Sequence, residues 1–302
     1  MFHRISEIDA GLTRRQLLHV AGALTVGATL GRSWLAAAES DAPLAVPQHA
    51  ATSDPGTKAA PIMQMGVLQG TFGRGTLEQR LDGVKACGLE CAQVSLDCAG
   101  LPAMPDEIPP GLAGRIRREA ATRGITIAAV QGTFNMSHPD NDSPAAWRDM
   151  AACVREATDI ARQAGVVLAF EPEVNNVVDS ARKARRLLDE IGSPHLKVTI
   201  DPANIFHAGE LPRMREILEE AFVLVGKDIV LAHAKDLDHD GDAGHKAAGQ
   251  GKLDYDRYLA LLHTGGFKGP LLLHGLSEAQ VPGCVAFLRE KLARAASVPA
   301  DK

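Results

Sequence analysis

The chain has 302 residues, of which 45% are hydrophobic and 4% aromatic, a composition that supports one large core or two modest ones. Its 32 Lys and Arg residues against 37 Asp and Glu give a formal net charge of −5. Because binding to duplex nucleic acid or polyphosphate usually needs an excess of basic residues, this charge argues against a nucleic-acid partner.

Residues 1–38 have the order of a targeting peptide. Arg14 and Arg15 precede a mild apolar run over 17–30, and the small residues at 36–38 follow it. Paired arginines, a Gly- and Ala-rich apolar segment and an A-x-A site resemble a twin-arginine export signal. The alternative is an uncleaved membrane anchor, but the run is shorter than the ~20 residues that span a bilayer. We therefore expect a periplasmic or secreted protein with no stable membrane insertion after signal cleavage.

Composition also sets the expected domain boundaries. Residues 39–61 are rich in Ala, Pro, Ser, Asp and Gly without periodicity, which predicts a disordered linker. The folded domain is expected over 62–295 and a tail over 296–302. The five cysteines lack C-x-x-C spacing, so we expect mostly small buried hydrophobic residues and at most one incidental disulfide: Cys87, Cys91, Cys98, Cys153 and Cys284.

From residue 62 onward, short apolar runs alternate with amphipathic stretches, a pattern typical of βα units around a parallel sheet. The apolar runs predict strands over 62–68, 92–96, 125–130, 166–170, 197–200, 229–232 and 271–273. The amphipathic stretches predict helices over 76–86, 110–123, 144–164, 179–191, 211–225, 255–262 and 281–295. Apolar runs of this kind indicate strands covered on both faces, in either an open doubly wound sheet or a closed α/β barrel.

A dinucleotide-binding fold is suggested by the glycines between the first strand and the first helix. Gly70, Gly73 and Gly75 have the spacing G-x-x-G-x-G, however, whereas the phosphate-binding fingerprint is G-x-G-x-x-G. The spacing therefore argues against a nicotinamide or flavin domain.

Polar residues follow the predicted strands: Gln69, Asp97, Gln131, Glu171, Asp201, His233 and His274. In a parallel α/β barrel these side chains would meet at the carboxyl-end mouth, where catalytic groups of such barrels lie. Two carboxylates and two imidazoles in one cavity need a cation among them. The sequence therefore predicts a divalent metal ion bound by Glu171, Asp201, His233 and His274. Its identity stays open among Mn²⁺, Mg²⁺, Co²⁺ and Zn²⁺.

Each predicted ligand also has a purely structural interpretation. Glu171 would cap the next loop, Asp201 would form a turn before proline, and His233 would be a hydrogen-bonded core residue. Glu173, two residues after Glu171 and on the same side, is an alternative carboxylate. Of the four residues, His274 is the one for which the sequence favours the ligand interpretation least strongly.

Further candidates lie on the loops after the strands. Lys235, Asp236 and His245 are expected to bind substrate hydroxyls or an anion, or to be solvated loop residues. Candidate substrate-binding residues elsewhere are Asn204, Gln131 and His138, with Asn135 beside the last. The stretch Gly249-Gln250-Gly251-Lys252-Leu253-Asp254 either lets the backbone approach a substrate or is a flexible loop capped by Asp254. The basic run over 182–186 is expected to be a solvated helix face.

Four motifs in order give the chain a family resemblance: A-F-E-P-E at 169–173, I-D-P-A-N at 200–204, H-A-K-D at 233–236 and G-x-G-x-x-D at 249–254. With these motifs, residues 62–295 resemble a sugar phosphate isomerase/epimerase of the xylose isomerase-like TIM barrel superfamily. The resemblance implies a (β/α)₈ barrel with one or two divalent ions, acting on sugars, ketoses or inosose-like polyols. It also implies that Glu171, Asp201 and His233 are metal ligands and that His245 is a basic substrate-binding residue.

Two departures from that family stand out. Its epimerases end their last strand on a second metal-binding, catalytic glutamate, where this chain has His274, and the nearest carboxylate is Glu278. The chain also shows seven predicted strands where the family has eight, because only one helix fits between Gln131 and Glu171. A TIM-type barrel of seven βα units must close with seven strands, stay open between two edge strands, or complete its sheet with a strand from a neighbouring molecule.

We therefore expect a metal-dependent sugar or sugar phosphate isomerase or epimerase that moves a proton through a metal-stabilised enediolate. The base would be Glu171 or Glu173 on one side and His274 or an ordered water on the other. A hydride-shift variant would need the metal but no base. The alternatives are a non-catalytic periplasmic sugar-binding protein or truncated relic, and, disfavoured by the charge, a metal-dependent endonuclease. The expected partner is a small sugar or polyol, and a homo-oligomer is possible.

Overall fold

The computed structural model describes residues 63–297, except residues 74 and 133–135. The predicted export signal, the predicted linker, Asn135 and residues 298–302 of the predicted tail lie outside the described residues. Seven parallel strands alternate with helices along the chain. The strands are β1 (Met65–Leu68), β2 (Cys91–Val94), β3 (Thr126–Val130), β4 (Leu168–Phe170), β5 (Leu196–Ile200), β6 (Ile229–Asp236) and β8 (Leu271–Leu273).

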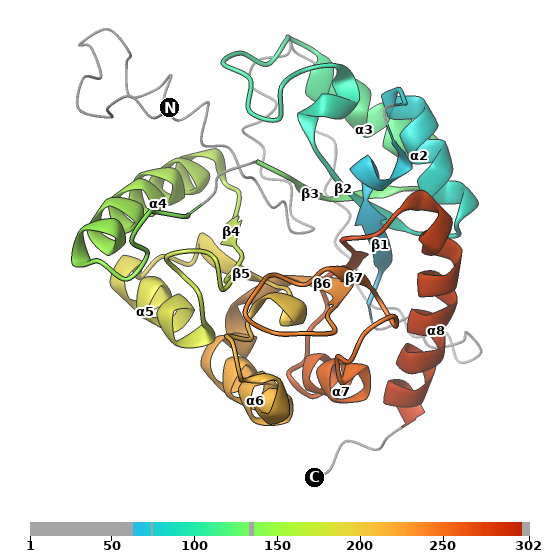
Figure 1. Cartoon of the computed structure of the whole chain (residues 1–302). Coiled ribbons are helices and arrows are strands. Elements are labelled where there is room, and N and C mark those ends of the chain that lie inside the picture. Colours follow the sequence, from blue (N-terminus) through green and yellow to red (C-terminus); the bar gives the residue numbers. More distant parts are fainter. Residues whose placement is uncertain (1–62, 74, 133–135, 298–302) are drawn as a thin grey trace, which may run out of the picture.

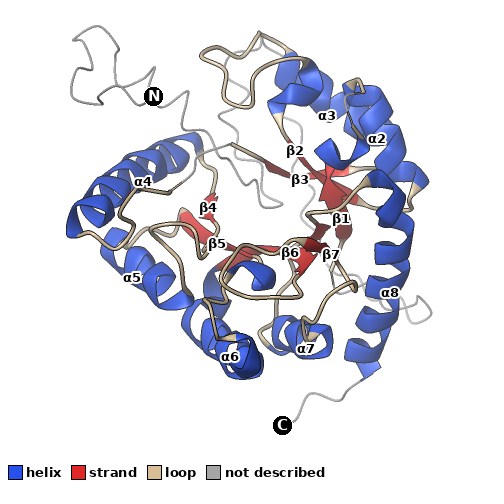
Figure 2. Ribbon diagram, in the orientation of Figure 1, coloured by secondary structure: helices blue, strands red, loops and turns tan. Residues whose placement is uncertain are grey.

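The α-helices surround the strands on the outside (Figures 1 and 2). They are α2 (Leu77–Ala86), α3 (Leu112–Thr122), α4 (Pro144–Ala164), α5 (Ala181–Ile191), α6 (Met214–Val225), α7 (Tyr255–Thr264) and α8 (Val281–Ser297). Short 3₁₀ turns join several elements, including η3 (Leu96–Ala99) and η4 (Pro202–Asn204). The expected TIM-type α/β architecture with seven βα units is confirmed.

The sheet is an open barrel. Its strand order is β3-β2-β1-β8-β6-β5-β4, so β3 and β4 form its two ends and do not pair among the described residues. The break lies where the sequence indicates a missing βα unit, because the chain passes from β3 through α4 directly to β4. Loops beyond these strands bridge the break, since the Val177 N–H donates to the Met136 carbonyl (2.9 Å).

Local sequence explains where the helices begin. Thr76 and Gln79 form a capping box at α2, and Ser143 caps α4 with Pro144 in the first helical position. The helix predicted from residue 179 begins at Ala181 instead, because the Ser180 hydroxyl accepts the Lys183 N–H and fixes the helix start there. The Asp179 carboxylate accepts a hydrogen bond from the Lys183 ammonium.

The sixth strand is longer than the sequence predicts. The expected end was Ala232, but β6 continues to Asp236 because its last two residues pair antiparallel with β7 (Lys246–Ala247). Such pairing is not visible in a short apolar run. His233 and Lys235 therefore lie within a strand rather than after one.

The buried apolar residues form two clusters. The larger lies between the strands and the helices, and the smaller joins strand residues with short side chains to two leucines: Cys91, Ala128, Ala129, Leu231 and Leu272. Gly66 on β1 belongs to this second region, where a Cβ would press on the Cys91 carbonyl and the Leu272 side chain. Small residues here let the strands approach closely.

The described cysteines form no disulfide. Three of them, Cys91, Cys98 and Cys284, are buried. The charged run on α5 is engaged by neighbouring helices and loops, with Arg185 bound to Asp228 and Arg186 over the Trp147 ring. In the described part of the chain, no helix has both the length and the apolarity needed to cross a membrane.

We expect Gly66→Ala to lower the free energy of unfolding by about 1–3 kcal/mol, because the added methyl overpacks the contact between β1, β2 and β8. Gly70→Ala is the matched control, since a Cβ there meets no atom within 4 Å. Urea unfolding of the two variants and the parent chain measures the difference. Equal stability of both variants would contradict this account of the sheet interior.

Candidate metal centre

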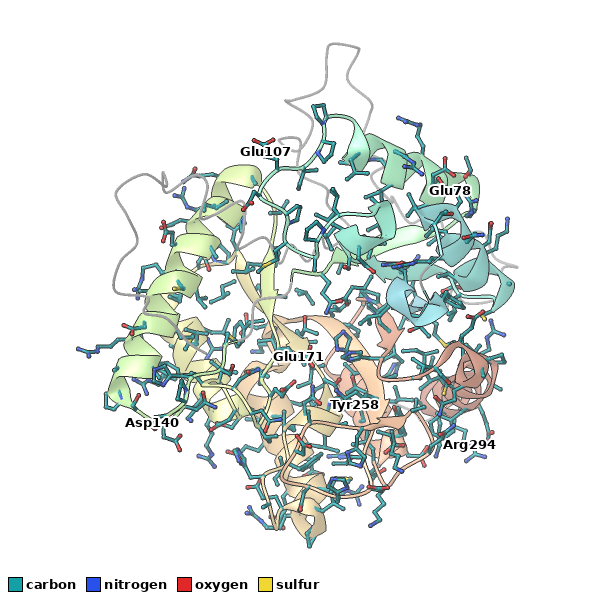
Figure 3. All side chains as sticks on the ribbon, turned by 45° about the horizontal axis from the view of Figure 1, so that its top comes forward. Glu78, Glu107, Asp140, Glu171, Tyr258 and Arg294 are labelled. Atoms are coloured by element: carbon teal, nitrogen blue, oxygen red, sulfur yellow. The ribbon has the colours of Figure 1, made fainter. Side chains whose placement is uncertain are left out.

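Four potential ligands come together at the carboxyl ends of neighbouring strands. Glu171 follows β4, Asp201 follows β5, His233 lies in β6 and His274 follows β8. One ligand atom from each lies within 4.8 Å of the others. Figure 3 places Glu171 near the centre of the ring of strands. Asp201 and His233 are buried, while the Glu171 and His274 side chains keep 26% and 27% of their surface, so solvent reaches one side of the cluster.

The His233 ring presents one nitrogen to the carboxylates. Its Nε2 lies 3.3 Å from Gln93 Oε1, an acceptor, so this nitrogen carries a proton and donates it. Its Nδ1 lies 3.4 Å from Glu171 Oε2 and 3.6 Å from Asp201 Oδ2. The Nδ1 atom is buried and has no hydrogen-bond partner. The Tyr258 hydroxyl holds the backbone by donating to the His233 carbonyl (2.9 Å).

Asp201 is the most constrained carboxylate. Its Oδ1 accepts the Ala203 N–H, and its Oδ2 lies 3.3 Å from His274 Nδ1 and 3.6 Å from Lys235 Nζ. Burial alone would raise the pKa of Asp201, but the Lys235 ammonium and the two imidazoles hold it well below the usual value. Asp201 is therefore ionised at neutral pH.

Glu171 is oriented from the other side. Its Oε1 accepts a hydrogen bond from Asn204 Nδ2 (2.6 Å), and Asn204 Oδ1 accepts the Gly244 N–H (2.9 Å). Burial opposes ionisation, but His233 lowers the pKa of Glu171. Glu173 behaves differently, because burial and the Glu171 charge raise its pKa. Glu171 suits a ligand and Glu173 suits a proton carrier.

These donors fit a divalent ion. Two ionised carboxylates and two imidazoles converge, and the buried Nδ1 of His233 points at them without a hydrogen-bond partner. The Gln93 acceptor fixes the ring as in metal sites, where the second nitrogen of a histidine ligand donates to an outer residue. The structure therefore brings together the four side chains predicted as ligands, Glu171, Asp201, His233 and His274.

The candidate substrate residues divide into two groups. Lys235 and Asn204 are buried and contact the cluster directly. His245 is exposed and engages Asp238 on the loop after β6. His138 is exposed, with its ring nitrogen beside the backbone of Asp140, and Gln131 is half-buried. No described hydrogen bond links the last three side chains to the cluster.

The glycine-containing loop after β7 closes on Asp236. One carboxylate oxygen of Asp236 accepts the Gly249 and Gly251 N–H groups and the other accepts those of Leu237 and Leu253. A Cβ on Gly251 would collide with this carboxylate. The glycines thus bring the backbone to Asp236, and Asp254 caps α7 by accepting the Arg257 N–H.

Sequence analysis missed Gln93 and Tyr258. Gln93 lies in the middle of β2, whereas only residues after strands were considered. Its signal is a single amide side chain in an otherwise apolar strand. Tyr258 is a fully buried residue of α7, and nothing in the sequence separates it from an ordinary core aromatic.

Comparison with known proteins identifies the family. Residues 113–291 match the family of xylose isomerase-like TIM barrels, more than half of the chain, so the protein belongs to this family. No curated protein sequence matches the chain.

Solved structures share the fold at low identity. D-psicose 3-epimerase from Clostridium cellulolyticum H10 is 14% identical with a TM-score of 0.57, over 76% of this chain and 99% of that chain. An L-ribulose 3-epimerase is 14% identical with a TM-score of 0.58, over 80% and 100%. A 3-keto-D-glucoside 4-epimerase from E. coli is 16% identical with a TM-score of 0.50, over 76% and 99%. The structural neighbours are thus sugar epimerases and isomerases.

We expect Asp236→Ala to destabilise the fold by about 3 kcal/mol, because it leaves several backbone N–H groups without an acceptor. Asp256→Ala is the control, since it removes one ion pair with Lys291 and one acidic residue of the first turn of α7, and such interactions contribute little. Thermal and urea unfolding measure both. A small effect at Asp236 would show that this carboxylate does not organise the loop.

In chelated protein, we expect a pKa of about 9 for the His233 ring, because Glu171 and Asp201 favour its charged form despite burial. The folded value lies above the ordinary 6.5. His233 protonation therefore stabilises the fold fully below about pH 6.5, and this stabilisation is lost as the pH rises through about 9. NMR titration and urea unfolding against pH, with His233→Gln as reference, measure it. A ring pKa at or below 6.5 would contradict the described geometry.

Proposed function

We propose that the protein is a metal-dependent sugar isomerase or epimerase that moves a proton at a carbon beside a carbonyl group. The observation that carries the proposal is the unpartnered Nδ1 of His233, which faces two ionised carboxylates in a buried site. A divalent cation at this point would balance the charge of the two carboxylates, and the carboxyl ends of barrel strands are where substrates of this architecture bind. The sugar epimerases among the structural neighbours support the reaction class.

Each residue has a proposed role. Glu171, Asp201, His233 and His274 hold the ion, which when bound stabilises negative charge on the sugar oxygen next to the carbon that loses its proton. Glu173, with a raised pKa, accepts or returns the proton together with Glu171. Lys235 and Asn204, beside the ligands, orient the hydroxyl groups of a sugar.

His274 stands where epimerases of the resembled family have a glutamate, and this difference determines which group moves the proton on the β8 side. An imidazole after β8 supplies a ligand and a proton carrier without adding negative charge. Proton transfer on that side then runs through His274 or an ordered water, and the carboxylate chemistry is confined to the β4 side.

Export belongs to the proposal as well. The arginine pair and the apolar run before residue 38 support twin-arginine export to the periplasm, and a homo-oligomer remains a prediction of the sequence. A sugar-binding protein without turnover is the competing function.

Metal content tests the site. We expect about one equivalent of Mn, Co, Zn or Mg by plasma mass spectrometry in protein purified without chelator, affinity nickel or added zinc, and the loss of that equivalent in Glu171→Gln/Asp201→Asn. Glu107→Gln/Asp149→Asn, which neutralises two exposed carboxylates, should keep the metal. A folded, metal-free parent chain would favour the binding or relic alternative.

Turnover tests the reaction. Ketohexoses and ketopentoses, free and phosphorylated, are incubated with the protein in D₂O. Proton transfer exchanges the carbon-bound hydrogen for deuterium, whereas a hydride shift does not. We expect Glu171→Gln to reduce exchange at least 10²-fold, because it removes both a base and a metal ligand, while the circular dichroism spectrum of the fold is unchanged. Undiminished exchange would remove Glu171 from the mechanism.

A further inference from the structure

The loop between β6 and β7 carries a second set of metal-ligating side chains. Asp238, His239 and His245 each offer one ligand atom, and these atoms lie within 4.8 Å of one another. His239 Nδ1 is 2.7 Å and His245 Nε2 is 2.6 Å from the same oxygen, Asp238 Oδ1. The two imidazole rings are stacked, with centroids 3.9 Å apart. Three donors of the type that transition metals prefer thus meet at one point.

The backbone of the loop orients the His245 ring. Its Nδ1 lies 3.3 Å from the Ala243 carbonyl, which can only accept, so Nδ1 carries a proton. Its Nε2 accepts the Asp238 N–H (3.3 Å). The same Nε2 lies 2.6 Å from Asp238 Oδ1, so either a proton or a metal ion must lie between these two atoms. A backbone carbonyl behind the first nitrogen is the arrangement that prepares a histidine for a metal.

Neighbouring residues hold the loop in shape. Lys246 Nζ binds Asp238 Oδ2 (2.8 Å) and leaves Oδ1 to the imidazoles. Asp242 accepts a hydrogen bond from Asn175 Nδ2, and Asp240 accepts the Leu211 N–H. Because these contacts fix the loop before an ion arrives, binding costs little ordering of the ligands.

We propose that Asp238, His239 and His245 bind a second divalent transition-metal ion, of the Zn²⁺, Ni²⁺ or Cu²⁺ class. Imidazole nitrogen suits these ions, whereas Mg²⁺ and Ca²⁺ prefer oxygen ligands. The site is exposed, so solvent completes the coordination. It stands apart from the first centre because it uses none of the same residues.

A chain of two hydrogen bonds links the loop site to the first centre. Gly244, next to His245, donates its N–H to Asn204, and Asn204 donates to Glu171. If the proposed sugar reaction is right, an ion on His245 also removes the side chain expected to bind substrate. Excess Zn²⁺ then lowers turnover of the parent chain but not of His239→Ala, whose basal turnover is unchanged.

Zinc stoichiometry tests the loop site without any reference to activity. The full chain is titrated with Zn²⁺ by calorimetry, and bound metal is counted after dialysis. We expect His239→Ala and His245→Ala each to lose one equivalent relative to the parent, and His263→Ala, which removes an imidazole from the last turn of α7, to lose none. Mg²⁺ should give no heat that depends on His239.

A variant of the first centre separates the two proposals. Glu171→Gln/Asp201→Asn should keep the equivalent that depends on His239, whether or not the first centre binds metal. Circular dichroism confirms folding, which exposed loop substitutions are expected to leave intact. Equal zinc binding by His239→Ala, His245→Ala and the parent chain would overturn the loop site, and the expected loss of one equivalent in both would establish it.

Discussion

Two negative charges placed close together in a buried site are the constraint around which the rest of the structure is arranged. Glu171 and Asp201 both have lowered pKa values, and each owes its ionisation to cationic or hydrogen-bonding neighbours rather than to water. Lys235, Asn204 and the Ala203 N–H satisfy their outer sides. What remains is the inner side, where the Nδ1 of His233 faces both carboxylates without a hydrogen bond. Either a proton on Nδ1 or a metal ion in its place completes this side of the site.

This constraint explains how a site persists in a barrel that lacks a unit. The four ligands come from β4, β5, β6 and β8, which are consecutive in the order of the sheet. The break falls between β3 and β4, outside that group. As an end strand, β4 receives support beyond its last residue, where the Val174 N–H donates to the Asn204 carbonyl and Glu173 donates to Val178. These loop contacts thus hold the backbone at Glu171 in place, as a neighbouring strand does for the other ligands.

The sequence predicted those parts of the fold that depend on local pattern. Buried parallel strands are short apolar runs in the sequence. A polar residue directly after such a run lies at the carboxyl-end mouth of the barrel, and this pattern predicts Glu171, Asp201 and His274 as site residues. Gln93 was missed because a short apolar run does not say which side chains point inward. The true length of β6 depends on pairing with β7, and the role of Asp236 depends on a loop that closes from 13 to 17 residues away. The sequence predicts that one βα unit is missing. Whether the seven remaining strands close or leave an open sheet depends on tertiary packing, which the sequence pattern does not contain.

The imidazole at position 274 changes the charge of the proposed centre. Two carboxylates, two neutral imidazoles and the Lys235 ammonium carry a charge of −1, so one divalent ion brings the centre to +1, whereas a glutamate in place of His274 would bring it to neutrality. Two nitrogen donors also favour Mn²⁺, Co²⁺ or Zn²⁺ over Mg²⁺. With no glutamate after β8, Glu173 is the carboxylate near the cluster that is not already one of the four ligands. Its raised pKa follows from its position beside Glu171, and the same proximity that disfavours its charge equips it to carry a proton.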